Sequence, residues 1–104
     1  MIAKLLYSDG TLQEKVVLLD KFPFIIGRHS EADLRLDNPL VSRRHCEITE
    51  ENGVLMARDL GSANGILVND AHVKESALKQ GEALSFGILT FRVAYHQDSR
   101  IQMA

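Results

Sequence analysis

Short apolar runs separated by turn residues, at intervals of about ten residues, are the feature that most constrains the fold of this chain. In the clearest run, every second residue is apolar through Leu89, Phe91, Val93 and Tyr95. A period of two is typical of a β-strand with one buried face. Asn52-Gly53, a dipeptide that favours tight hairpin turns, separates two further runs at residues 45–49 and 54–59. Repeated short strands with turns between them predict an antiparallel β-sandwich or barrel.

The remaining segments give weaker local signals. Asn69-Asp70 is a second possible hairpin turn, and residues 74–80 are the only stretch in which a helical turn or two is predicted. Residues 96–104 lack periodicity and are predicted to be a polar tail or the beginning of a linker. We therefore predict a single all-β domain over residues 1–104, with its core at about residues 2–95 and roughly ten to eleven short strands.

Composition excludes several classes of function. A net charge of −2 gives no electrostatic case for a general nucleic-acid binder. Cys46 is the only cysteine, so no disulfide can form within the chain. The N-terminal residues are too poor in apolar side chains for a secretion signal, and no apolar run approaches the roughly eighteen residues that span a bilayer. We expect a soluble cytoplasmic protein or module with no nucleic-acid or membrane partner.

The histidines and glycines do not predict a cofactor. The histidines show no spacing typical of metal ligands, and they lie at His29, His45, His72 and His96. No glycine-rich loop of the phosphate- or dinucleotide-binding kind is present in the sequence. We predict neither a metal nor an organic cofactor.

Polar residues with complementary chemistry fall on three separate connections between the predicted strands. Arg28 follows one run, Ser42 and Arg43 precede another, and Asn64 lies in the polar stretch of residues 59–65. A planar guanidinium and a hydroxyl suit a phosphate dianion, because forked donors match its oxygens. A carboxamide pairs with both a peptide N–H and a peptide C=O. This set predicts a receptor for a phosphorylated segment of another protein.

Each of these positions also has a simpler explanation. Gly27 is either a residue with positive φ at a strand end or a position whose missing side chain lets Arg28 project into a loop cleft. Ser42 can satisfy local backbone groups, and Asn64-Gly65 is a common tight turn. Arg28 and Arg43 taken singly are ordinary surface arginines.

An enzyme built on Ser42 or Cys46 is the least favoured alternative. Ser42 lacks the sequence context of a nucleophile elbow, and no acidic residue with a clear motif orients His45. Strand alternation predicts that Cys46 shares a face with Ile48 and that His45 lies on the opposite face. We expect His45 to be a buried, hydrogen-bonded residue that braces the loop carrying Ser42, and we predict no catalytic residues.

The ordered motifs resemble the forkhead-associated (FHA) domain, a β-sandwich that recognises phosphothreonine in partner proteins. The resemblance runs from about Phe24 to Tyr95, most of the chain. It is carried by Phe24-Ile25-Ile26-Gly27-Arg28, Asp33-Leu34-Arg35-Leu36, Val41-Ser42-Arg43-Arg44-His45, Asp59-Leu60-Gly61-Ser62-Ala63-Asn64-Gly65 with Val68-Asn69, and Gly81-Glu82 with Phe86-Gly87. The resemblance implies peptide-binding loops at one end of the sandwich.

The resemblance also implies a role for each matched residue. Arg28 and Ser42 are expected to grip the phosphate with help from Arg43, and Asn64 to hydrogen-bond the peptide backbone beside the phosphothreonine. A serine/threonine kinase is then implied upstream. The resemblance further implies a preference for threonine over serine, through a small pocket for the methyl group.

Supporting residues and departures from the family pattern follow in the same way. Gly27, His45 and Gly65 are expected to hold the shape of the loops. Ala63 stands where many family members have threonine or serine, and Ile66 replaces a frequent threonine. These two differences leave open a second function, a phosphate-independent scaffold or oligomerisation domain that uses the same sandwich.

Overall fold

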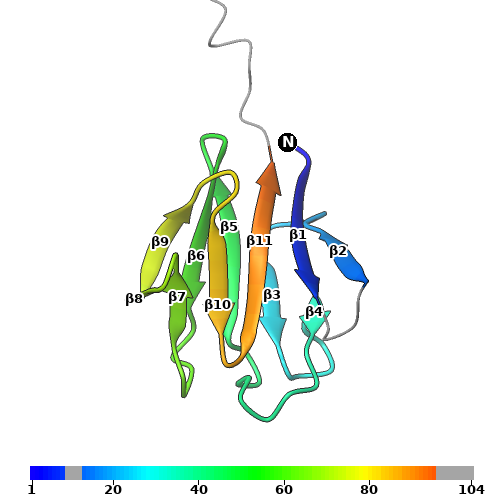
Figure 1. The fold of residues 1–104 in the computed structure, drawn as a ribbon, viewed down its shortest axis with the longest axis vertical. Helices are drawn as coiled ribbons and strands as arrows, with labels where there is room; N and C mark the ends of the chain where they lie inside the picture. The colour runs from blue at the N-terminus through cyan, green and yellow to red at the C-terminus, as the bar shows by residue number, and fades with distance from the viewer. Residues whose placement is uncertain (9–12, 96–104) are drawn as a thin grey trace, which may run out of the picture.

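The computed structural model describes residues 1–8 and 13–95, which form two β-sheets packed face to face (Figure 1). The six-stranded sheet contains, in spatial order, β2 (Glu14–Leu18), β1 (Ala3–Ser8), β11 (Leu89–Tyr95), β10 (Ala83–Phe86), β7 (Ile66–Val68) and β8 (Ala71–Val73). The five-stranded sheet contains β4 (Leu34–Arg35), β3 (Phe24–Gly27), β5 (Cys46–Glu51), β6 (Val54–Asp59) and β9 (Glu75–Leu78). The predicted all-β sandwich is confirmed, with the difference that β3 and β4 pair in parallel.

The core lies between the two sheets because the strands alternate as predicted. In β11, Phe91, Val93 and Tyr95 are buried, and Thr90 and Arg92 are exposed. The opposite sheet contributes the buried inward-facing residues of β3, β5 and β6, which include Phe24, Ile26, Ile48, Leu55 and Ala57. The Tyr95 hydroxyl donates a hydrogen bond to the Leu78 carbonyl at 2.5 Å and thereby links the two sheets through a buried polar contact.

Both predicted hairpin turns are present. Asn52 and Gly53 have φ values of 53° and 82° between β5 and β6. Asn69 and Asp70 have φ values of 49° and 68° between β7 and β8. Left-handed backbone at both central residues is the requirement of a two-residue turn that matches strand twist, and asparagine, aspartate and glycine tolerate it best.

The helical prediction for residues 74–80 is wrong. Residues 75–78 form strand β9, which pairs antiparallel with β6 and places Leu55 opposite the buried Leu78. A single helical turn is marginal by itself, so hydrogen bonding to the edge of β6 and burial of Leu78 outweigh the local preference.

The predicted orientation of His45 is also wrong. The strand begins only at Cys46, and His45 and Cys46 are both fully buried. The His45 N–H donates to the Ile26 carbonyl of β3 at 3.0 Å, and the His45 ring stacks on Phe86 in the core, so regular alternation starts only after His45. The predicted tail, residues 96–104, lies outside the described residues. None of the described segments is a helix long and apolar enough to cross a bilayer.

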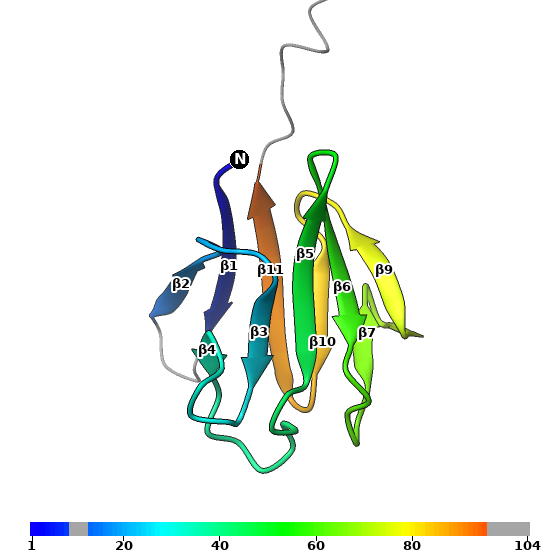
Figure 2. The same cartoon turned by 180° about the vertical axis from the view of Figure 1, so that it is seen from behind.

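The connections that carry the predicted binding residues gather at one end of the sandwich. Figures 1 and 2 show the β3–β4, β4–β5, β6–β7 and β10–β11 connections at the end opposite the N-terminus and the end of β11. The topology therefore brings together segments that are far apart in the sequence.

Candidate functional site

Backbone hydrogen bonds hold the end of β3 against the loop between β4 and β5. The Arg28 N–H donates to the Ser42 carbonyl and the His29 N–H to the Arg43 carbonyl, both at 3.0 Å. Arg28 therefore lies beside the segment that carries Ser42 and Arg43. Sequence reasoning assigned these residues to one site, and the fold brings them together.

Gly27 permits this close approach. A Cβ atom at Gly27 would lie 2.1 Å from the Arg43 carbonyl oxygen and 2.8 Å from its carbonyl carbon, distances that real Cβ atoms do not show. Gly27 does not have a positive φ, so the explanation through left-handed backbone is wrong. Its missing side chain leaves room for the loop that precedes β5.

Gly27→Ala is expected to destabilise the fold by about 2–3 kcal/mol, because the methyl group would push rigid backbone segments apart. Urea unfolding monitored by circular dichroism measures the change. Gly53→Ala is the comparison variant, because a Cβ there meets nothing within 4 Å and its cost comes from the positive φ alone. A smaller loss for Gly27→Ala than for Gly53→Ala would contradict the packing explanation.

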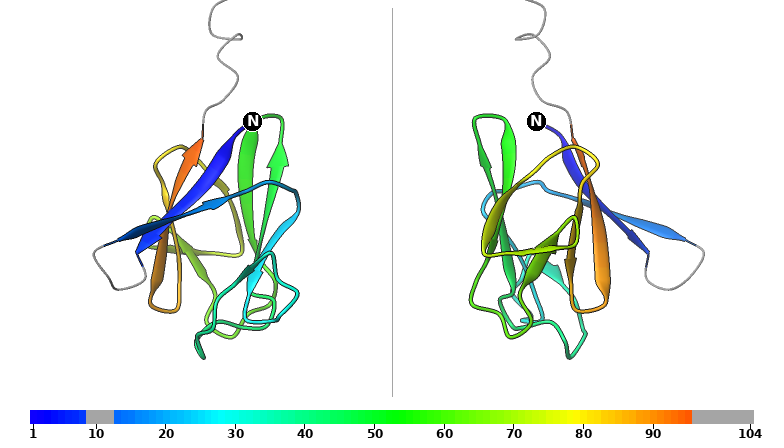
Figure 3. Two further views of the ribbon diagram at one scale, coloured as in Figure 1. Left: turned by 90° about the vertical axis from the view of Figure 1, so that its right-hand side faces the viewer. Right: turned by 60° about the vertical axis from the view of Figure 1, so that its left-hand side comes forward.

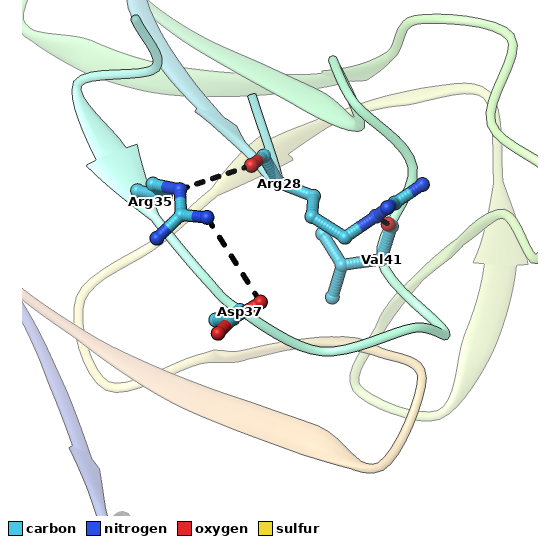
Figure 4. A network of polar contacts seen from close by, with 4 residues as sticks. All are labelled: Arg28, Arg35, Asp37 and Val41. Atoms are coloured by element: carbon cyan, nitrogen blue, oxygen red, sulfur yellow. Dashed lines mark hydrogen bonds and ion pairs between the residues drawn. The ribbon is translucent and has the colours of Figure 1, made fainter. Parts of the chain in front are cut away.

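The side chain of Arg28 is fixed at its base and open at its tip. Its Nε donates to the Val41 carbonyl at 3.0 Å, and its own carbonyl accepts from Arg35 Nε at 3.2 Å (Figure 4). Arg35 in turn faces the Asp37 carboxylate at 4.0 Å. Among the described residues, no hydrogen bond or ion pair occupies the two terminal nitrogens of Arg28. An exposed guanidinium held in this way offers a preoriented pair of donors.

Ser42 connects the β4–β5 loop to the β6–β7 loop. Its Oγ accepts a hydrogen bond from the Ala63 N–H at 3.0 Å. Within the described part of the chain, no acceptor takes the hydroxyl hydrogen, so that hydrogen remains available to an oxygen of a ligand.

His45 joins the same two loops from within the core. Its Nδ1 accepts from the Ser42 N–H at 3.0 Å, and its Nε2 lies 2.8 Å from the Gly65 carbonyl. Since a carbonyl only accepts, Nε2 carries the hydrogen and the imidazole is the neutral tautomer with hydrogen on Nε2. The ring also stacks on Phe86, with centroids 4.5 Å apart. Both ring nitrogens are thus engaged in backbone contacts that position the loops.

Asn64 lies exposed on the β6–β7 loop, where its Nδ2 donates to the Leu40 carbonyl at 2.7 Å. This bond joins the β6–β7 loop to the β4–β5 loop. The amide oxygen of Asn64 has no hydrogen-bond partner among the described residues. Gly65 follows with a φ of 73°, which favours glycine at the point where the chain turns into β7. Arg43 is exposed on the neighbouring loop.

Sequence reasoning missed the groups that shape these loops from within. The carbonyls of Leu40 and Val41 accept from Asn64 and Arg28, and sequence carries no signal for such backbone roles. Ser62 was also missed, although its N–H approaches the Asp59 carboxylate at 3.3 Å and its Oγ accepts from the Gly65 N–H at 2.9 Å. An aspartate three residues before a serine is typical of a side-chain-stabilised turn, and that spacing was the available signal.

The two departures from the family pattern have different structural consequences. Ala63 is exposed on the β6–β7 loop, where only its backbone N–H contacts Ser42. Ile66 is fully buried as the first residue of β7, so its side chain belongs to the core.

Cys46 is unsuited to nucleophilic chemistry in the folded state. It is fully buried, and burial raises the pKa of its thiol to about 12, with a smaller contribution from the Asp59 carboxylate. The thiolate is the reactive form, so the thiol is inert near neutral pH.

Cys46 is expected to resist iodoacetamide in the native protein and to be alkylated in urea, as measured by intact mass. Rapid alkylation of the native protein at neutral pH would contradict this prediction.

Asp33 anchors the β3–β4 connection next to the site. Its carboxylate accepts from the Ile25 N–H at 2.7 Å and pairs with Lys21 Nζ at 2.9 Å. The backbone bond to Ile25 chiefly lowers the pKa of Asp33 below its usual 3.8, and Lys21 lowers it further against the opposing effect of burial.

A carboxylate with a lowered pKa stabilises the fold above its unfolded-state pKa, and this contribution is lost as the pH falls through the folded-state value. Asp33→Asn is therefore expected to reduce stability at neutral pH by about 1–2 kcal/mol and to lessen the decline below about pH 4. Urea titrations at several pH values measure both effects. Parallel pH profiles for the two proteins would contradict the prediction.

Comparison with known proteins agrees with this geometry. The family model described as FHA domain matches residues 24–87. The glycogen accumulation regulator GarA of Mycolicibacterium smegmatis is 38% identical over 78 residues, which cover 75% of this chain and 48% of GarA. The oxoglutarate dehydrogenase inhibitor of Corynebacterium diphtheriae is 36% identical over 83 residues, covering 80% of this chain and 57% of the inhibitor. The chain thus spans about half the length of these two relatives.

Solved structures show the same fold. A structure from a study of phosphothreonine-dependent FHA domain interactions has a TM-score of 0.84 and 35% identity, covering 94% of this chain and 100% of the other. The FhaA FHA domain, solved in complex with an intracellular domain, has a TM-score of 0.79 and 36% identity, covering 88% of this chain and 98% of the other. With the family model matched over most of the chain, this protein belongs to the FHA domain family.

Proposed function

We propose that this domain binds threonine-phosphorylated segments of partner proteins. The observation that carries the proposal is the convergence of unsatisfied polar groups from three connections, namely the Arg28 tip, the Ser42 hydroxyl hydrogen and the Asn64 amide oxygen. Hydrogen bonds within the chain join these loops to one another, so the site is preorganised.

Each residue has a distinct role in the proposed complex. Arg28 and Ser42 bind the phosphate, and the exposed Arg43 adds positive charge. The amide oxygen of Asn64 accepts a hydrogen bond from a backbone N–H of the peptide beside the phosphothreonine. A phosphate adds nearly two negative charges and strong acceptors that an unmodified threonine lacks, so most of the discrimination comes from charge-assisted bonds.

The domain acts as a reader and not as an enzyme. The site contains donors for an anion, the buried thiol of Cys46 is protonated, and both ring nitrogens of His45 are occupied by backbone contacts. The relatives named as a regulator and as an enzyme inhibitor support a binding role. We place this role in the cytoplasm, downstream of a serine/threonine kinase that supplies the phosphorylated partner.

A degenerate phosphothreonine peptide library tests the proposal and identifies the preferred flanking residues. Calorimetry then compares the selected peptide with its unphosphorylated and phosphoserine versions. The phosphothreonine peptide is expected to bind at least about tenfold more tightly than the unphosphorylated peptide, since one charge-assisted bond contributes about 1.5–3 kcal/mol. Equal affinities for these two peptides would overturn the proposal.

A further inference from the structure

A cavity of about 330 Å³ opens on the outer face of the five-stranded sheet, beside the candidate site. Its lining residues are Ile25, His29, Glu31, Ala32 and Arg44. Phe24 and Ile26 point into the core, so Ile25 between them points away from the core and lines the cavity from the sheet. None of the residues assigned to the phosphate is among the lining residues, so the cavity is distinct from the phosphate-binding groups.

The cavity is continuous with the candidate site through the backbone. His29 follows Arg28 in the chain and Arg44 follows Arg43. The His29 N–H donates to the Arg43 carbonyl at 3.0 Å, and Figure 3 shows the β3–β4 connection beside the segment that leads into β5. An extended peptide advances about 3.3 Å for each residue, so a segment whose phosphothreonine lies at Arg28 reaches the cavity within about four residues.

The apolar and aromatic walls of the cavity are held in place. Ile25 belongs to β3, and the Ala32 N–H donates to the His29 carbonyl at 3.0 Å. The His29 imidazole is fixed as well, because its Nδ1 accepts from the Glu31 N–H at 3.0 Å. Apolar groups beside a fixed ring suit a flat apolar side chain, which gains from burial and from ring stacking.

The charged residues of the cavity have no partner within the described part of the domain. Arg44 and Glu31 both line it, yet among the described residues no ion pair joins them and no hydrogen bond engages either charged group. A guanidinium stacks favourably on the face of an aromatic ring. A carboxylate accepts a hydrogen bond from a phenol hydroxyl or an indole N–H. The two groups therefore complement different parts of one aromatic side chain that has a polar edge.

We infer that this cavity binds a tyrosine or tryptophan side chain of the phosphorylated partner, within about four residues of the phosphothreonine. The inference rests on the proposed function, because it concerns the same bound segment. A volume of about 330 Å³ is near the lower end for ligand pockets, so one large side chain fills it. Glu31 would repel an acidic side chain, and an aliphatic side chain would leave Glu31 and Arg44 without a polar or aromatic group to contact.

A walk of single tyrosines through a phosphothreonine peptide tests the inference. Each peptide carries tyrosine at one of the positions within about four residues of the phosphothreonine and alanine at the others. Calorimetry is expected to show a gain in affinity of about five- to tenfold over the all-alanine peptide, at one or two neighbouring positions on one side. Tryptophan at the best position should give a similar gain, and glutamate there should give none.

Variants of the domain locate this gain. The tyrosine and all-alanine peptides should bind equally to Arg44→Ala, and equally to Ala32→Leu, whose larger side chain would fill the cavity. Ala32→Leu keeps every charge, so it separates occupation of the cavity from electrostatic effects. Arg92→Ala is the matched control and should keep the wild-type preference for tyrosine, because Arg92 is an exposed arginine of the other sheet. Each comparison is made within one protein, so a change in overall phosphate affinity does not affect it.

Fluorescence gives a readout of the contact itself. The chain contains no tryptophan, so the emission of a tryptophan in the peptide reports only on the peptide. Its emission maximum should move to shorter wavelength on binding to the wild type and should stay unchanged on binding to Ala32→Leu.

The outcomes separate this inference from the proposed function. Peptides that bind only when phosphorylated but gain nothing from tyrosine at any position overturn the inference and leave the proposed function intact. A gain from glutamate in place of tyrosine, or an undiminished gain from tyrosine in Arg44→Ala and Ala32→Leu, also overturns the inference. Binding that does not depend on phosphorylation overturns the proposed function and the inference with it.

Discussion

Arg28→Ala is expected to weaken phosphothreonine-peptide binding by at least about tenfold. Truncating one partner of a desolvated charged pair typically costs about 2–5 kcal/mol, and each 1.4 kcal/mol is about tenfold in affinity. Arg28 is held for this contact, because its Nε is fixed on the Val41 carbonyl while its terminal nitrogens stay open. Calorimetry with one phosphorylated peptide measures the loss directly.

Two variants separate this effect from loss of charge and from loss of structure. Arg28→Lys keeps the charge but lacks the planar fork, so its affinity should fall between those of the wild type and Arg28→Ala. Arg92→Ala is the matched control, since Arg92 is also an exposed arginine bonded to a backbone carbonyl, that of Gly81. Unchanged affinity in Arg28→Ala would remove Arg28 from the mechanism.

His45→Ala is expected to destabilise the domain by about 3–5 kcal/mol. The change leaves the Ser42 N–H and the Gly65 carbonyl without their buried partner, which costs about 1–3 kcal/mol for each group. It also opens a cavity beside Phe86, the ring on which His45 stacks. For a domain of this size such a loss is a large share of the total stability.

Urea unfolding at neutral pH measures the loss, with His72→Ala as the control because His72 is exposed. The affected bonds hold the loops that carry Ser42 and Asn64, so peptide affinity should fall in His45→Ala even where the protein is still folded. A His45→Ala protein as stable as His72→Ala would show that the buried imidazole does not brace the loops.

Most of the individual strands and turns were predictable from sequence because their causes are local. The alternation in residues 89–95 follows from side chains that point to opposite faces of one strand. Asn52-Gly53 and Asn69-Asp70 form turns because their own backbones tolerate positive φ. The same holds for the chemistry of the candidate site, since the donors of Arg28 and Ser42 belong to the residues themselves.

Contacts between distant segments were not predictable in this way. Residues 74–80 carried a weak helical signal, yet β6 offered an open edge and the segment became β9. His45 packs its ring on Phe86 in the core because it precedes β5, which begins at Cys46, and so is not bound by the alternation of that strand. The parallel pairing of β3 with β4 likewise depends on the path of the β3–β4 connection, which brings Leu34 beside Ile26.

Sequence by itself determined the all-β class, the turns and the set of groups that can bind an anion, because periodicity, turn propensity and side-chain chemistry are properties of short segments. Only the tertiary structure decided that Gly27 makes room for the Arg43 backbone, that the carbonyls of Leu40 and Val41 hold Asn64 and Arg28, and that His29 and Arg44 line one cavity. These features depend on how segments far apart in the chain are placed against one another, and that placement exists only once the two sheets have packed.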